Sequence, residues 1–172
     1  MNTAVYCITS SVLLAESILN QLRQAGFSSD AVSVLFSDKS GSHDFVHERN
    51  TKAPEGVAAG GVAGMGAGAI LGWLAGIGTL AIPGVGPFIA AGPIMAALGG
   101  AAIGSAAGGI IGALVGVGIP EYEAKRYEGK VRAGSVLISV HAVDSREIDR
   151  AKNLFAHAGA EDIATSSEAA VE

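Results

Sequence analysis

The chain has 172 residues, a formal net charge of −5 and only 5% aromatic residues. This length suits one domain that carries an insertion. Nucleic-acid recognition needs basic patches, so an acidic chain of this kind excludes that class and we expect no nucleic-acid partner. Cys7 is the single cysteine, so no internal disulfide is possible. The first residues carry no basic segment and no cleavage signature, and we therefore expect no signal peptide.

Charge is distributed unevenly along the chain, because no Asp, Glu, Lys, Arg or His lies between Glu55 and Glu121. This shift in composition divides the chain into five parts. They are a first α/β part (residues 1–38), a polar linker (39–55), an uncharged apolar segment (56–120), a connecting helix with a second α/β part (121–168) and a short tail (169–172).

The first α/β part predicts a strand, a helix and a second strand. Residues 4–9 are rich in β-formers, and Ser10 and Ser11 are suited to cap the helix that follows. Apolar residues then recur at helical spacing until Gly26, a typical helix stop. Residues 31–36 predict the second strand, and the polar linker after them is expected to be mainly loop.

The uncharged segment predicts two helices that pack closely through glycine. Its glycines recur at every fourth position on both sides of a break rich in proline and glycine. Such spacing leaves a stripe without side chains along a helix, and two stripes allow close backbone approach. The predicted packing residues are Gly56, Gly60, Gly64, Gly68, Gly72, Gly76, Gly100, Gly104, Gly108, Gly112 and Gly116. The predicted turn consists of Pro83, Gly84, Gly86 and Pro87.

The two predicted arms, residues 57–82 and 93–118, are long enough to cross a membrane. Each would be about 39 Å long as a helix, whereas the core of a bilayer is about 30 Å thick. Cations flank the domain side of the hairpin and not the turn, which places both ends and the α/β domain in the cytoplasm. The predicted membrane-interface residues are Lys52, Tyr122, Lys125, Arg126 and Tyr127. The alternative is that the arms form the buried core of a soluble homo-oligomer.

The last part repeats the plan of the first. Residues 135–142 predict a strand, Asp144 and Glu147 a helix cap, Gly159 a helix stop and residues 162–166 a final strand. Two strand–helix–strand units of this kind make a split βαβ sandwich. We therefore expect an α+β, ferredoxin-like domain with the glycine-zipper helical hairpin inserted between its second and third strands.

Residues that could carry chemistry are few. His43 and His47 are spaced to share a metal on a helix, but Asp44 stands where a metalloprotease helix needs Glu, and no third ligand is evident. Cys7 lies inside a predicted strand with no activating neighbour. We expect a solvated linker around the two histidines, with no catalytic residue, no metal and no cofactor.

Several runs resemble bacterial general stress or heat-induced stress proteins. They are residues 47–48 (HE), 51–56 (TKAPEG), 81–87 (AIPGVGP), 89–93 (IAAGP), 118–121 (GIPE) and 124–127 (AKRY). The resemblance covers most of the chain, and it implies stress-linked expression and membrane association, with no established activity. The layout is similar, more distantly, to the ActD-type membrane subunit of quinol:acceptor oxidoreductases.

Together these observations predict a non-enzymatic, stress-related scaffold that is membrane-associated, faces the cytoplasm and self-associates through its hairpin. Its expected partners are further copies of itself and the lipid bilayer. Two alternatives stay open: a soluble homo-oligomer with the hairpins as its core, and a regulatory domain that senses a small molecule. The second alternative rests on analogy with regulatory domains of the same shape.

Overall fold

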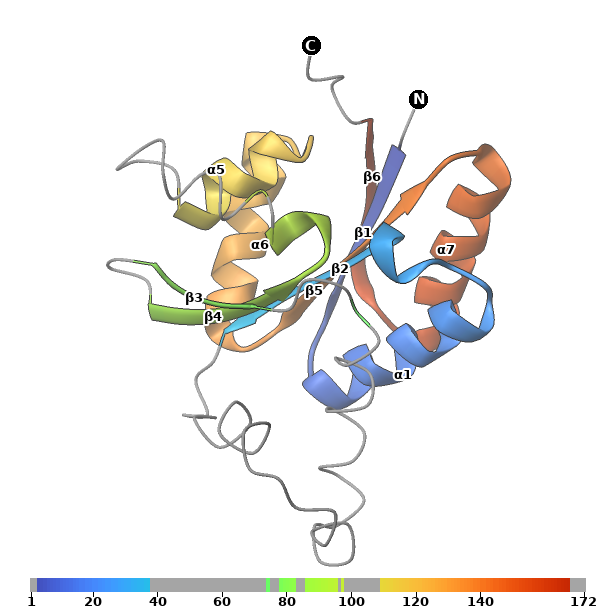
Figure 1. Ribbon diagram of the computed structural model, residues 1–172, viewed down its shortest axis with the longest axis horizontal. Coiled ribbons are helices and arrows are strands. Elements are labelled where there is room, and N and C mark those ends of the chain that lie inside the picture. Colours follow the sequence, from blue (N-terminus) through green and yellow to red (C-terminus); the bar gives the residue numbers. More distant parts are fainter. Residues whose placement is uncertain are drawn as a thin grey trace, which may run out of the picture.

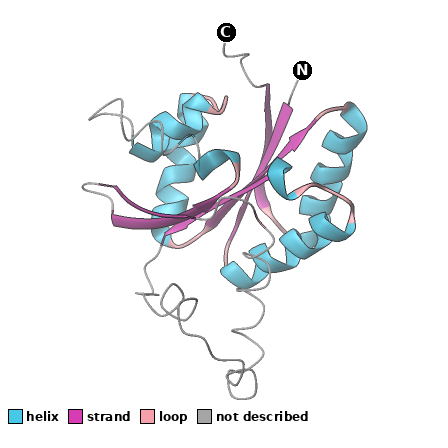
Figure 2. Cartoon of the chain, viewed as in Figure 1, coloured by secondary structure: helices cyan, strands magenta, loops and turns pink. Residues whose placement is uncertain are grey.

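A computed structural model describes residues 3–37, 74, 78–82, 86–95, 97 and 109–167. These residues form a mixed α+β fold, in which helices cover both faces of one antiparallel sheet (Figures 1 and 2). In chain order the elements are β1 (Thr3–Thr9), α1 (Val12–Gln24), the 3-10 turn η1 (Ser29–Ala31), β2 (Val32–Ser37), β3 (Gly78–Ile82), β4 (Gly86–Ala91), α5 (Gly109–Gly116), α6 (Glu121–Ala133), β5 (Val136–Ala142), α7 (Ser145–Ala158) and β6 (Glu161–Ser167).

The described part of the sheet has six strands in the order β3-β4-β2-β5-β1-β6, and every neighbouring pair is antiparallel. Strands from both ends of the chain therefore lie in one sheet, with β5 paired between β2 and β1. The two predicted α/β parts are built together, and neither makes a sheet of its own.

Helices α1 and α7 cover one face of the sheet, here called the α1/α7 face (Figure 1). Helix α1 begins at Ser11, whose hydroxyl accepts a hydrogen bond from the Leu14 amide at 3.2 Å. Its apolar side, including Ile18 and Leu22, is buried against alternate residues of the strands. Each such fully buried side chain contributes about 2 kcal/mol, so this face accounts for much of the stability.

Helix α7 carries the predicted caps at both ends. The Asp144 carboxylate accepts from the Glu147 amide at 2.8 Å, and the Glu147 carboxylate accepts from the Val143 amide at 2.9 Å. At the other end Gly159 is left-handed, with φ 82°, which satisfies the last carbonyl groups. These predictions are confirmed, as are the helix of the first part and the four strands of both α/β parts, each within one residue at its ends.

Helices α5 and α6 cover the opposite face, here called the α5/α6 face (Figure 1). Ile110 and Leu114 of α5 are fully buried there, together with Tyr127 of α6. The Tyr6 hydroxyl of β1 donates a hydrogen bond to the Val117 carbonyl oxygen at 3.0 Å, which ties the end of α5 to the sheet. The end of the uncharged segment thus belongs to the core of this domain.

The helix predicted to continue to Ile82 is wrong over its last residues. Residues 78–82 form strand β3, which pairs with β4 from Gly78↔Ala90 to Ile82↔Gly86. The predicted chain reversal lies where expected, but it joins two strands instead of two helices, and Gly86 and Pro87 belong to β4. Strand β4 in turn pairs with β2, so the hairpin satisfies backbone groups that would otherwise lie at an open sheet edge.

The second predicted arm is not one continuous helix. Gly109, inside the predicted arm, has a φ of 38°, outside the right-handed helical region, so the backbone turns at this point. Ile94 and Ile110 are both buried in the same core, and the chain is therefore anchored to the sheet on either side of residues 98–108. Within the described ranges, no helix combines the length and apolar character needed to cross a bilayer.

Candidate interaction surfaces

Helix α5 presents two different sides. Ala113 and Leu114 are buried against the sheet, whereas Val115 is 43% exposed. Gly112 and Gly116 are predicted packing residues, and a Cβ atom added at either would meet nothing within 4 Å. We call Gly112, Val115 and Gly116 the α5 outer face. It is uncharged and, among the described residues, has no packing partner at its two glycines.

Most other predicted site residues lie outside the described part of the chain. They are Gly56, Gly60, Gly64, Gly68, Gly72, Gly76, Gly100, Gly104, Gly108, Pro83, Gly84, Lys52, His43 and His47. In the described ranges no group of three or more His, Cys, Asp or Glu is placed to hold a metal ion.

The predicted interface residues of α6 differ in their surroundings. Tyr122 is 75% exposed, and Lys125 forms an ion pair with Glu121 at 2.6 Å. The prediction for Tyr127 needs correction, because its ring is buried against Tyr6, with centroids 6.5 Å apart. Its hydroxyl donates to the Asp162 carbonyl oxygen at 3.2 Å. Burial raises the pKa of Tyr127 far above its ordinary value, so this side chain is part of the core and does not reach a surface.

One edge of the sheet, β6, carries charge at its first two residues, Glu161 and Asp162. The register between β1 and β6 shifts by one residue opposite Cys7, and Asp162 lies at this bulge with φ 50°. The bulge directs the Asp162 carboxylate to α6, where it forms ion pairs with Arg126 and Lys130. The adjacent Asp162 carboxylate raises the pKa of Lys130.

Both Asp162 oxygens therefore have a cationic partner. One of them, Oδ2, is buried and lacks ideal hydrogen-bond geometry, but Lys130 lies within ion-pair distance of it. A second carboxylate, that of Glu161, lies 3.4 Å from Lys130 Nζ. This β6 lock, formed by Arg126, Lys130, Glu161 and Asp162, fastens α6 to the edge strand.

Among the described residues, the other edge, β3, has no comparable protection. Strand β3 has the sequence GTLAI, and it pairs with β4 in an unbroken register of five residues. In the part of the chain that the structure describes, β3 pairs on that side alone. An edge strand of this kind offers backbone N–H and C=O groups to a further strand.

A close contact between Gly92 and β2 holds the β3–β4 hairpin in place. A Cβ atom at Gly92 would lie 3.0 Å from Ser33 Cα and would collide with the Val32 carbonyl oxygen. The Ile94 amide donates to the Ser33 hydroxyl oxygen at 3.3 Å, inside the core. Only glycine allows this approach, because the position also requires a positive φ.

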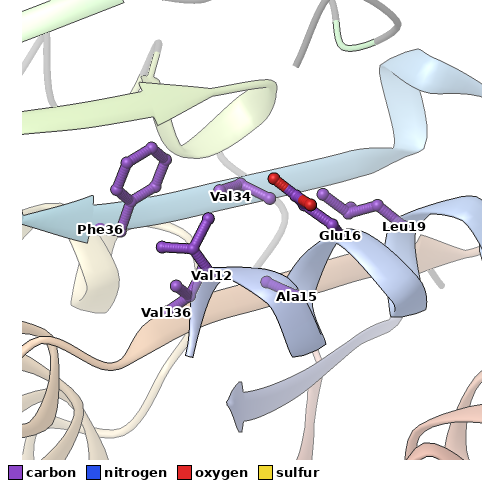
Figure 3. Close-up of a pocket in the computed structure, with 7 residues that line it drawn as sticks. All are labelled: Val12, Ala15, Glu16, Leu19, Val34, Phe36 and Val136. Atoms are coloured by element: carbon purple, nitrogen blue, oxygen red, sulfur yellow. The ribbon is translucent and has the colours of Figure 1, made fainter. Parts of the chain in front are cut away.

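A shallow hollow lies between α1 and β2 (Figure 3). It encloses about 260 Å³, including the open solvent at its mouth, which is below the volume usual for small-molecule sites. Its walls are apolar except for Glu16, whose pKa is raised by burial. The lining residues are Val12, Ala15, Glu16, Leu19, Val34, Phe36 and Val136.

A row of polar side chains on the α5/α6 face was missed in the sequence. Ser139 pairs in register with Ser33 on one side and Tyr6 on the other. Both serines are fully buried, and the Ser139 hydroxyl has no hydrogen-bond partner among the described residues. The sequence pattern that could have revealed this row lies in β5. There Leu137, Ser139 and His141 alternate with apolar residues that point to the α1/α7 face.

Cys7 lies in the middle of the sheet on the α1/α7 face, with no exposed surface. Burial raises the pKa of its thiol far above the ordinary value. The thiolate form needed by a nucleophile or a metal ligand is therefore strongly disfavoured.

Comparison of the chain with models of known protein families, with curated proteins and with solved structures found no match.

Proposed function

We propose that this is a non-enzymatic protein that self-associates through its uncharged segment, residues 56–120, to form a homo-oligomer. The observation that carries the proposal is the two-sided character of α5. Its inner side is buried in the domain, whereas Gly112, Val115 and Gly116 face outwards without a charge. Glycine inside a helix costs about 1 kcal/mol relative to alanine, and close packing of a second backbone offsets that cost.

The fold that supports this proposal is, in our assignment, a ferredoxin-like split βαβ sandwich. Its support is the strand order β2-β5-β1-β6, antiparallel at every pair, with α1 and α7 on the same face. The uncharged segment is then inserted between the second and third strands of the sandwich. Its described residues extend the sheet with β3 and β4 and cover the second face with α5.

Contact with a bilayer is a second candidate, favoured by the absence of charge from residue 56 to residue 120. A membrane-associated protein with its α/β domain in the cytoplasm would agree with the resemblance to stress proteins. The described residues give this candidate less support. Ile94, Ile110 and Leu114 are occupied in the core, and Lys125 and Arg126 are both paired with carboxylates.

A sensor of small molecules has the least support of the three. The sheet face left free by α1 and α7 is covered by α5 and α6, and the hollow beside Glu16 is small. Catalysis by Cys7 lacks support as well, because burial favours the neutral form of its thiol.

Sedimentation velocity without detergent or lipid tests the proposal over a range of concentrations. The wild type is expected to sediment as a species larger than the 17.1 kDa chain. Gly112→Leu adds a side chain on the α5 outer face and should shift the distribution to smaller species. Gly129→Leu is the matched control, because Gly129 lies on the exposed side of α6 with nothing within 4 Å.

Two outcomes would contradict the proposal. One is a wild type that stays monomeric at all concentrations, and the other is an equal response to Gly112→Leu and Gly129→Leu. Flotation with vesicles that contain anionic lipid separates the two candidates. A protein that is monomeric in solution but floats with vesicles binds the bilayer and not a second copy, which supports the second candidate.

A further inference from the structure

The two edges of the sheet differ in charge and in regularity, two of the features that prevent strands from adding to one another. Natural edge strands are protected by charge, proline, bulges or a covering element. Strand β6 has a bulge at Asp162, two acidic residues and ion pairs to α6. Strand β3 has no charged residue and no proline within Gly78–Ile82, and its register with β4 contains no bulge.

We propose that β3 pairs antiparallel with the β3 strand of a second copy across a two-fold axis, so that two sheets join into one. This inference rests on the self-association in the proposed function and names one of its contacts. Alternate residues of β3 direct their N–H and C=O groups to the open side, and an identical strand presents the same pattern in reverse. A two-fold contact of this kind is self-complementary.

The chemistry of β3 selects a second copy over a charged peptide. Residues 78–82 contain no ionisable side chain, so two identical strands do not repel one another, and a charged strand would find no opposite charge. An axis at Leu80, the central residue, is the register that pairs all five residues of both strands. Together with the α5 outer face, this edge gives each copy two separate self-complementary contacts.

Disulfide trapping tests the register directly. In L80C the two introduced thiols would face each other across the axis, at the 4.5–5.5 Å Cβ separation of directly opposed residues. Under mild oxidation with copper-phenanthroline we expect rapid formation of a covalent dimer. L13C is the matched control, because Leu13 is 66% exposed on α1, which packs over the inner strands β1 and β5. The natural thiol does not interfere, since Cys7 is fully buried.

A charge placed on the edge tests the same contact without a covalent bond. T79K puts like charges on both strands in diagonal positions beside the axis, within reach of long side chains, and should shift sedimentation to smaller species by weakening this contact. N153K adds the same charge on the exposed side of α7 and should change nothing. Far-UV circular dichroism identifies a variant that fails to fold, in which case the trapping result decides.

The outcomes separate this inference from the proposed function. If the wild type is oligomeric, but L80C cross-links no faster than L13C and T79K keeps its size, edge pairing is wrong and self-association stands. If the wild type is monomeric at every concentration, both are wrong.

Discussion

The β6 edge carries acidic residues, a bulge and ion pairs to α6, whereas the β3 edge carries only uncharged side chains and a regular register. The difference follows from where each strand lies in the sequence. Strand β6 comes from the charged part of the chain, and β3 comes from the run of residues 56–120 that lacks charge. A protein that needed only a stable monomer would gain from a lysine in β3. The proposed pairing of β3 with a second copy agrees with the lack of a lysine in this strand.

A substitution at Gly92, which holds the β3–β4 hairpin against β2, should have the largest effect on the free energy of unfolding. Gly92→Ala places a methyl group against the Val32 carbonyl oxygen at a position with φ 76°. We expect a loss of about 3 kcal/mol in the free energy of unfolding, from strain and steric overlap together. Urea denaturation followed by circular dichroism measures it.

Gly159→Ala is the control for Gly92→Ala, because it shares the positive φ but has nothing within 4 Å. It should cost only about 1 kcal/mol, the backbone strain alone. Equal losses at the two glycines would show that the contact between Gly92 and β2 does not hold the hairpin to the sheet.

Opening the β6 lock should have a smaller effect. Asp162→Ala leaves Arg126 and Lys130 without their shared carboxylate, and we expect a loss of about 1 kcal/mol, because both cations are partly exposed to solvent. Sedimentation should also show new association, since the edge is less protected. Asp162→Asn keeps a residue that tolerates positive φ and separates the charge from the backbone effect. If neither variant changes stability or association, the lock is not what closes this edge.

The sequence pattern predicted the outer framework of the fold well. The β-forming residues of β1, β2 and β5 and the helical spacing in α1 and α7 are local signals. The caps at Ser11, Asp144 and Gly159 are local as well, and each of these features lies where expected. These elements are specified by residues close together in the chain. The covering of the second face by α5 and α6 was not predicted, because it depends on which surface the uncharged segment meets after folding.

The errors in the uncharged segment have one physical cause. A glycine at every fourth position is compatible with a helix, but it adds no side chain that favours a helix over a strand. Residues 86–91 form a strand and not a helix because they pair with the edge of β2. That edge exists only in the tertiary structure. Tyr127 was misplaced for a similar reason, since its burial depends on contact with Tyr6, more than a hundred residues earlier in the chain.

Amide hydrogen exchange, resolved by peptide and measured at several protein concentrations, tests the central claim most directly. Because β3 is proposed to pair with a second copy, exchange in residues 78–82 should slow as the concentration rises. Exchange in residues 161–167 should not change, because β6 takes no part in the proposed contact. Equal exchange in β3 at all concentrations, or a slowing confined to β6, would contradict the account.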